Sequence, residues 1–156
     1  MKYANKLVAS VAVFSLLLTL GCGGGDDNPT PSEVAGENLV ATWVQGTITG
    51  AAAETFEDFS ITINTTNTPG ELNYSTQNTN TLIFPRNGTF TLPENPNFTT
   101  GAQVTRDNDV QVDVTLLNDN QLRLEFTIDS NSSVPTENSR TMQVDGEYVF
   151  TLDKQE

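Results

Sequence analysis

Few side chains in this sequence could take part in covalent chemistry. The 156 residues contain one cysteine, Cys22, and no histidine. Without histidine, the chain by itself cannot build a Ser-His-Asp triad, a Cys-His pair or a histidine-ligated zinc site. The remaining reactive groups are the thiol of Cys22 and the carboxylates of 20 acidic residues. The composition therefore excludes the histidine-dependent classes of hydrolase and metalloenzyme.

Paired carboxylates are the catalytic arrangement that this composition still permits, as in glycosidases. No spacing marks any pair, and so many acidic residues would supply pairs by chance. The clusters Asp107-Asn108-Asp109 and Asn118-Asp119-Asn120 could offer oxygen ligands to Ca²⁺, but neither has the spacing of a calcium loop. Tight turns select the same residue types. We therefore expect no enzymatic activity, no catalytic residues, no cofactor and no metal site.

Cys22 stands directly after a segment with the features of an export signal. Lys2 and Lys6 give a positive start, and residues 7–20 carry no charge. This run would form about 21 Å of helix at ~1.5 Å per residue. It is short for a membrane span, which needs about 20 apolar residues, and it suits the apolar core of a signal peptide. Gly21 is small, and a lone cysteine in an exported protein would otherwise be a reactive liability.

The run Leu18-Thr19-Leu20-Gly21-Cys22 resembles the lipobox of bacterial lipoproteins, with Thr19 where leucine is commonest. The resemblance implies that residues 1–21 are removed, that the Cys22 thiol receives a diacylglycerol, and that the new amine is acylated, for example with palmitate. Cys22 is thus the expected lipidation site, and the membrane is the expected partner. An ordinary secretory signal with an incidental thiol and a transmembrane anchor are the alternatives.

Residues 22–37 read as a flexible acidic tether. Glycines make the segment pliable, and Pro29 and Pro31 stiffen its middle. Glycines followed by Asp26-Asp27 resemble the export signals of surface lipoproteins in the Bacteroidetes group, and a plain acidic linker is the alternative. We expect a lipid-anchored protein of the outer membrane, at the cell surface or on the periplasmic face. The net charge of −13 argues against nucleic acid as a partner.

Residues 38–154 read as one β domain, because apolar and polar side chains alternate along them. Asp145-Gly146 predicts a hairpin turn, and Ala51 to Asp58 is the one candidate for a short helical turn. Such short strands joined by turns favour an antiparallel up-and-down meander closed as a small barrel, with a β-sandwich as the alternative. The predicted strands are 39–49, 59–63, 72–74, 82–84, 90–92, 110–116, 122–128, 142–144 and 148–152.

The opening Leu39-Val40-Ala41-Thr42-Trp43 resembles the first strand of lipocalin-like lipoproteins. The resemblance continues through 59–63, 105–110 and 146–152. It implies a lipocalin-like barrel in which Trp43 closes one end. A buried tryptophan in any other β domain is the alternative for Trp43.

Two functions fit this reading. The one we favour is a non-enzymatic structural or interaction module with a filled core, which would contact a surface protein partner through its outer face. The alternative is a small hydrophobic-ligand-binding protein with apolar side chains around the barrel mouth. A cavity of roughly several hundred Å³ inside the barrel would favour the ligand binder, and a packed interior would favour the interaction module.

Overall fold

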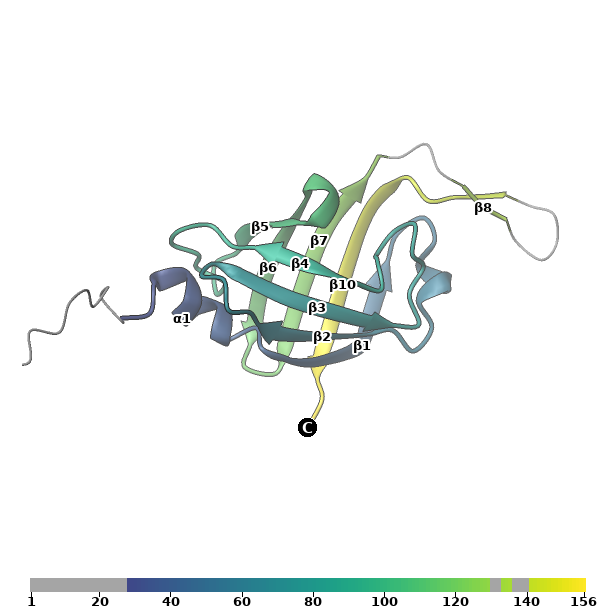
Figure 1. Cartoon of the computed structure of the whole chain (residues 1–156). Helices are drawn as coiled ribbons and strands as arrows, with labels where there is room; N and C mark the ends of the chain where they lie inside the picture. The colour runs from purple at the N-terminus through teal and green to yellow at the C-terminus, as the bar shows by residue number, and fades with distance from the viewer. Residues whose placement is uncertain (1–27, 130–132, 136–140) are drawn as a thin grey trace, which may run out of the picture.

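The alternating pattern produces eight barrel strands in the computed structural model, which describes residues 28–129, 133–135 and 141–156 (Figure 1). Cys22 and the expected leader 1–21 lie outside these residues. The barrel strands are β1 (Ala41–Thr49), β2 (Ser60–Thr65), β3 (Glu71–Gln77), β4 (Asn87–Thr91), β5 (Ala102–Arg106), β6 (Val110–Asn118), β7 (Gln121–Ile128) and β10 (Gly146–Lys154). The other elements are α1 (Pro31–Glu37), η1 (Ala53–Phe56), η2 (Asp107–Asp109), β8 (Ser133–Pro135) and β9 (Thr141–Gln143).

The barrel is an up-and-down antiparallel meander. Each strand pairs with the preceding barrel strand, and β10 closes the ring against β1. The hairpin β8–β9 lies between β7 and β10 in sequence and forms a separate two-stranded sheet. The prediction of an all-β, lipocalin-like small barrel is confirmed, and the β-sandwich alternative is wrong. The shortest seam of the barrel joins β4 to β5 through two residue pairs, Phe90–Arg106 and Thr91–Thr105.

One end of the barrel, here called the α1 end, carries α1 and the turns that follow β2, β4 and β6. The backbone N–H of Leu92 donates to the carbonyl of Gly70 at 2.8 Å, and a Cβ on Gly36 of α1 would meet the side chain of Leu92. The chain returns to this end after β10, where the N–H of Gln155 donates to the carbonyl of Thr42 at 2.9 Å.

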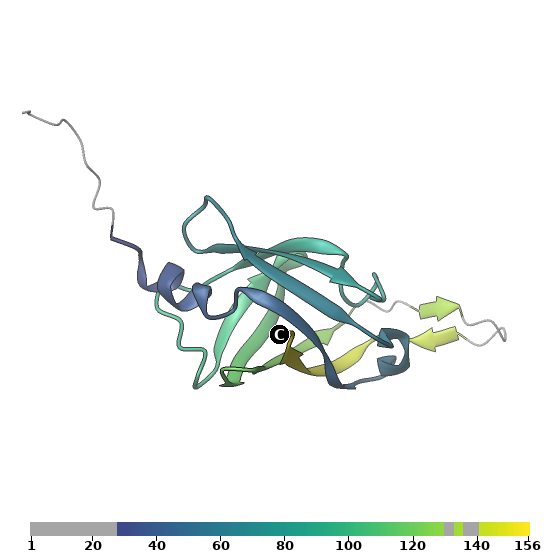
Figure 2. The same cartoon turned by 90° about the horizontal axis from the view of Figure 1, so that it is seen from below.

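The opposite end, here called the η1 end, carries η1, the loop between β3 and β4, and η2. Side chains join the β3–β4 loop to the segment around η1. Asn80 Nδ2 donates to Thr55 Oγ1 at 3.2 Å, and Asn78 Nδ2 donates to the carbonyl of Asp58 at 3.0 Å. Both views of the chain show α1 and the β8–β9 hairpin at opposite ends of the molecule (Figures 1 and 2). The short helical turn expected within 51–58 is confirmed as η1.

The expectation of a flexible tether through residue 37 is wrong for its last part, because residues 31–37 form α1. Thr30 caps the helix: its Oγ1 accepts from the N–H of Glu33 at 3.3 Å, and the Glu33 carboxylate accepts from the N–H of Thr30 at 2.7 Å. Pro31 occupies the first helical position, where its missing N–H costs nothing. The capping box and the proline fix where the helix begins. Packing against the barrel stabilises the short helix that follows.

Two of the predicted strand features are also wrong. Residues 82–84 lie in the loop between β3 and β4, where Ile83 and Phe84 are fully buried and Leu82 is 49% exposed. Ile83 and Phe84 are adjacent and both buried, so this apolar run belongs to a loop that folds into the barrel and not to a strand with alternating faces. Asp145-Gly146 joins no hairpin, because β9 pairs with β8 and β10 pairs with β7 and β1.

The hydrophobic core lies inside the barrel and continues under both ends. Leu39 and Phe98 extend it to the α1 end, and Phe56 and Val144 extend it to the η1 end. Of the helices in the described ranges, none has both the length and the apolar character to cross a membrane.

Candidate functional site

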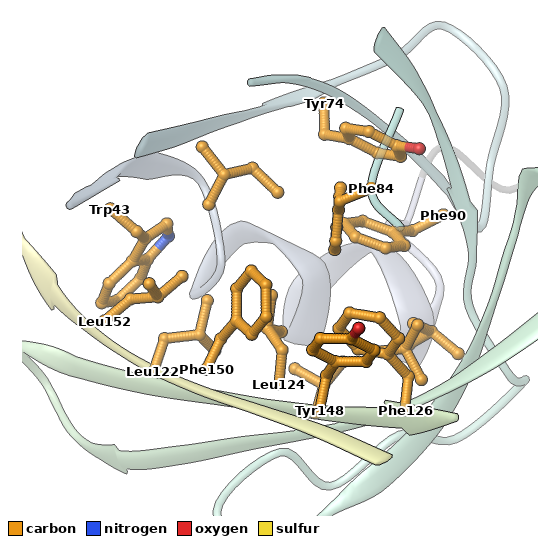
Figure 3. Close-up of a cluster of buried hydrophobic side chains, with 14 of the residues drawn as sticks. Trp43, Tyr74, Phe84, Phe90, Leu122, Leu124, Phe126, Tyr148, Phe150 and Leu152 are labelled. Carbon is orange, nitrogen blue, oxygen red and sulfur yellow. The ribbon is translucent and has the colours of Figure 1, made fainter. Parts of the chain in front are cut away.

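Aromatic side chains from the walls and from two loops occupy the interior at the η1 end. Phe56 of η1 and Phe84 of the β3–β4 loop are both fully buried. The Phe84 ring centroid lies 5.3 Å from that of Tyr74 and 5.6 Å from that of Phe126, and Phe56 lies 4.9 Å from Phe150. In the close-up, the rings of Phe84, Phe90, Phe126, Tyr148 and Phe150 gather inside the barrel, with Tyr74 above them (Figure 3). Protein side chains therefore take the space where the mouth of an open barrel would admit a ligand.

Trp43 lies at the α1 end and is fully buried. Its Nε1 donates to the carbonyl of Leu39 at 2.9 Å, so the indole ties the start of β1 to the chain that leaves α1. The Nζ of Lys154 lies 5.8 Å from the centroid of the ring. In the close-up, Trp43 and Leu152 lie together at one side of the cluster, away from Phe126 and Tyr148 (Figure 3). This burial fits both interpretations of Trp43, as the residue that closes one end of a lipocalin-like barrel and as a core tryptophan of any other β domain.

Arg106, the last residue of β5, is the one charged side chain among the buried residues of the described chain, with 3% of its surface exposed. Its Nη1 donates to the carbonyl of Ile83 at 3.1 Å. Its Cζ lies 4.7 Å from the ring centroid of Phe84 and 5.4 Å from that of Phe126. Its Nε is buried and has no hydrogen-bond partner within the described ranges, and no carboxylate there forms an ion pair with it.

Beside Arg106, a hydrogen bond joins β3 to the turn after β5. Tyr74 Oη donates to Asp107 Oδ1 at 2.6 Å. The bond passes over Gly88 of β4, where an added Cβ would collide with both the Tyr74 hydroxyl and the Asp107 carboxylate. The absence of a side chain at residue 88 therefore makes room for a tie across the weakly paired β4–β5 seam.

The electrostatics of this cluster follow from burial. Burial, reinforced by the hydrogen bond to Asp107, raises the pKa of Tyr74 well above its ordinary value. Burial lowers the pKa of Arg106, which the charges of Tyr74 and Asp107 partly oppose. Arginine starts from a pKa above about 12, so it stays charged at neutral pH. The η1 end thus holds a fixed positive charge with an unused N–H donor in largely aromatic surroundings.

The acidic turns singled out in the sequence make hydrogen bonds within the protein, one across the barrel wall and one within its own turn. Asp107 accepts from Tyr74, and Asn118 Oδ1 accepts from the backbone N–H of Asn120 at 2.9 Å, as in an Asx turn. The described residues bring no three Cys, Asp or Glu side chains together in an arrangement suited to a metal ion.

Charge is distributed unevenly over the outside of the barrel. Glu71 is the single charged residue in β1 to β4. A shallow hollow of about 480 Å³ over β2, β3 and β4 is bordered by amides and hydroxyls; this neutral face comprises Asn64, Asn73, Ser75, Asn87 and Thr89. A second hollow, of about 380 Å³, lies across β5, β6, β7 and β10; this acidic face includes Gln103, Asp113, Glu125 and Glu147.

Compared with models of known protein families, with curated proteins and with solved structures, the chain matches none. Of the two residues expected to have a special role, Trp43 has its buried position, and Cys22 lies outside the described residues. Arg106 was missed, and so was β5. Val104 and Arg106 are the buried positions of β5. Only one of them is apolar, so the strand lacks the repeated apolar alternation that marks the other strands. An arginine two residues after an inward valine is the signal that could have found both.

Proposed function

We propose that this chain is a lipid-anchored outer-membrane protein that acts without catalysis, as a structural or interaction module that works through the outside of its barrel. The observation that carries this proposal is the occupied interior, in which Phe56 and Phe84 are fully buried where a ligand would enter. A barrel whose centre is filled by its own side chains has its outer surface left for contacts.

The sequence supports the anchored part of the proposal. The lipobox-like run ends at Cys22, and α1 begins at Pro31, so a short linker separates the lipid from the barrel. At about 3.3 Å per residue, a fully extended linker of this length would span at most roughly 30 Å. The α1 end would then face the membrane, and the η1 end would face away from it.

The neutral face is the part of the outer surface that we assign to the partner. Its amides and hydroxyls offer donors and acceptors without charge, in a chain of net charge −13. An acidic face repels the many acidic surfaces of other proteins, whereas neutral polar side chains can pair with a partner of either sign. The partner would be another protein of the same surface.

Site-specific cross-linking in cells that make the full chain tests this assignment. A photoreactive residue in place of Asn73 should give one discrete protein adduct, and the same residue in place of Glu125 should not. Adding Asn87→Lys on the neutral face should abolish the adduct, whereas the matched Gln103→Lys on the acidic face should leave it. Equal labelling from both positions, or labelling indifferent to Asn87→Lys, would contradict the proposal.

One observation favours the alternative of a small-ligand binder. Arg106 is buried with an unused donor in the part of the barrel where such a ligand would lie. Side chains of the β3–β4 loop would have to leave before a ligand could enter.

A further inference from the structure

The charge on Arg106 lacks a structural explanation within the folded barrel. A buried charge is costly unless it is paired and its donors are satisfied. Within the described residues, the guanidinium makes one hydrogen bond, to the carbonyl of Ile83, and its aromatic neighbours Phe84 and Phe126 contribute cation–π attraction. A methionine could fill the same space at lower cost, so a buried charge with an unpartnered donor at this position points to a ligand of opposite sign.

We propose that Arg106 anchors a latent binding site for a small amphipathic carboxylate, and that residues 79–86 of the β3–β4 loop occupy this site in the folded chain. This inference rests on the ligand-binding alternative and is independent of the neutral face. The carbonyl of Ile83 takes the place of a ligand oxygen. The fully buried side chains of Ile83 and Phe84 take the place of its apolar tail.

The loop is the part of the interior that can leave without opening the barrel. Residues 79–86 belong to no strand, so their departure breaks no ladder bond of β3 or β4. Thr76 of β3 holds the end of the loop through the carbonyls of Pro85 and Arg86, at 2.9 and 2.7 Å. Leu82 is already 49% exposed. A hinge at the Thr76 contacts would carry Ile83 and Phe84 outward together, once the hydrogen bonds from Asn80 to Thr55 and from Arg106 to the carbonyl of Ile83 are broken.

The walls that remain would suit a single carboxylate with an apolar tail. Tyr74, Phe126 and Phe150 would line the vacated space, because each contacts Phe84. A carboxylate could accept from both Nε and an Nη of Arg106, the bidentate geometry that guanidinium favours. Asp107 lies close enough to influence the charge on Arg106, so it would disfavour a ligand with several negative charges.

Calorimetric titration with octanoate tests the proposal, with octanol as the matched neutral probe. The full chain would be held in lipid nanodiscs, and empty nanodiscs would give the background. We expect octanoate to bind about tenfold more tightly than octanol, the factor given by one or two charge-assisted hydrogen bonds. Arg106→Met should remove this preference, whereas Arg123→Met, a change in a half-exposed arginine of β7, should preserve it.

A second variant keeps the test decisive if Arg106→Met fails to fold in a thermal melt. Phe84→Ala empties part of the site, and it should bind octanoate several-fold more tightly than the parent chain. Octanoate binding that is the same in Arg106→Met, or absent from both the parent chain and Phe84→Ala, would overturn the proposal. Binding by Phe84→Ala that disappears on adding Arg106→Met would support it. Cross-linking from Asn73 uses no ligand, so failure of the interaction function would be seen separately.

Discussion

Tyr74 and Asp107 are 33 residues apart in sequence, and a 2.6 Å hydrogen bond joins them across β4. The bond crosses the barrel wall where β4 and β5 share two residue pairs. The side chains of Tyr74 and Asp107 thus reinforce a part of the barrel wall where few backbone hydrogen bonds join neighbouring strands.

Gly88→Ala should destabilise the barrel by about 1–3 kcal/mol, the usual cost of overpacking a well-packed site. The new methyl group would collide with the Tyr74 hydroxyl and the Asp107 carboxylate. Urea unfolding followed by circular dichroism measures the effect. Thr89→Ala, on the same strand but at a partly exposed position, serves as the control and should change the midpoint much less. Equal midpoints for Gly88→Ala and the parent chain would show that the bond is dispensable.

Alkaline pH should destabilise the protein through Tyr74. Its pKa is raised in the folded state, so above about pH 10 the unfolded chain loses a proton that the folded chain keeps. The contribution of Tyr74 to the free energy of unfolding is therefore fully present below that pH. Above it, the free energy of unfolding falls by about 1.4 kcal/mol per pH unit. Tyr74→Phe should lose stability less steeply between pH 10 and 11. Tyr148, whose pKa burial also raises, affects both proteins alike. Parallel pH profiles would refute the assignment.

Arg106→Met should leave the free energy of unfolding unchanged or raise it by up to about 2 kcal/mol, as when buried charges are replaced by apolar residues of similar volume. The carbonyl of Ile83 loses its donor, which limits the gain. Chemical denaturation measures the difference. A loss greater than that of Gly88→Ala would mean that Arg106 is chiefly a structural residue.

Trp43→Ala should cost about 3–5 kcal/mol, because a large and fully buried side chain leaves a cavity. The carbonyl of Leu39 also loses its donor. Trp43→Phe keeps much of the packing and should cost less, which separates the ring from the hydrogen bond. Identical midpoints for the parent chain and Trp43→Ala in a guanidinium melt would be incompatible with this role.

Cys22→Ala should abolish labelling by radioactive palmitate and move the protein out of the membrane fraction, because we propose the thiol as the acceptor of the lipid. Proteolysis of intact cells then distinguishes the two faces of the outer membrane: digestion of the barrel means surface display, and protection means the periplasmic side. Unchanged fractionation of Cys22→Ala would remove the anchor from the proposed function.

Much of the fold could be predicted from the sequence, because strict alternation in 110–116, 122–128 and 148–152 specifies half-buried strands. The errors have physical causes. The capping box at Thr30 was visible, but a seven-residue helix has almost no periodicity to detect. Residues 82–84 are apolar because a loop enters the core, and a short apolar run in the sequence does not distinguish such a loop from a strand.

The candidate site was harder to predict than the fold. Arg106 interrupts the apolar pattern of β5, so the sequence presents it as one more polar position. Its significance depends on burial and on the missing partner of its Nε. Both properties arise from contacts with Ile83, Phe84 and Phe126, which only the closed barrel brings together.

The last strand ends beside the first, where Gln155 donates to the carbonyl of Thr42. The polypeptide thus enters and leaves the barrel at the same end, the α1 end. Any segment or domain joined before β1 or after β10 would lie at that end. A fluorescent reporter fused behind Glu156 would lie at the α1 end, near the proposed anchor, and would leave the η1 end unobstructed.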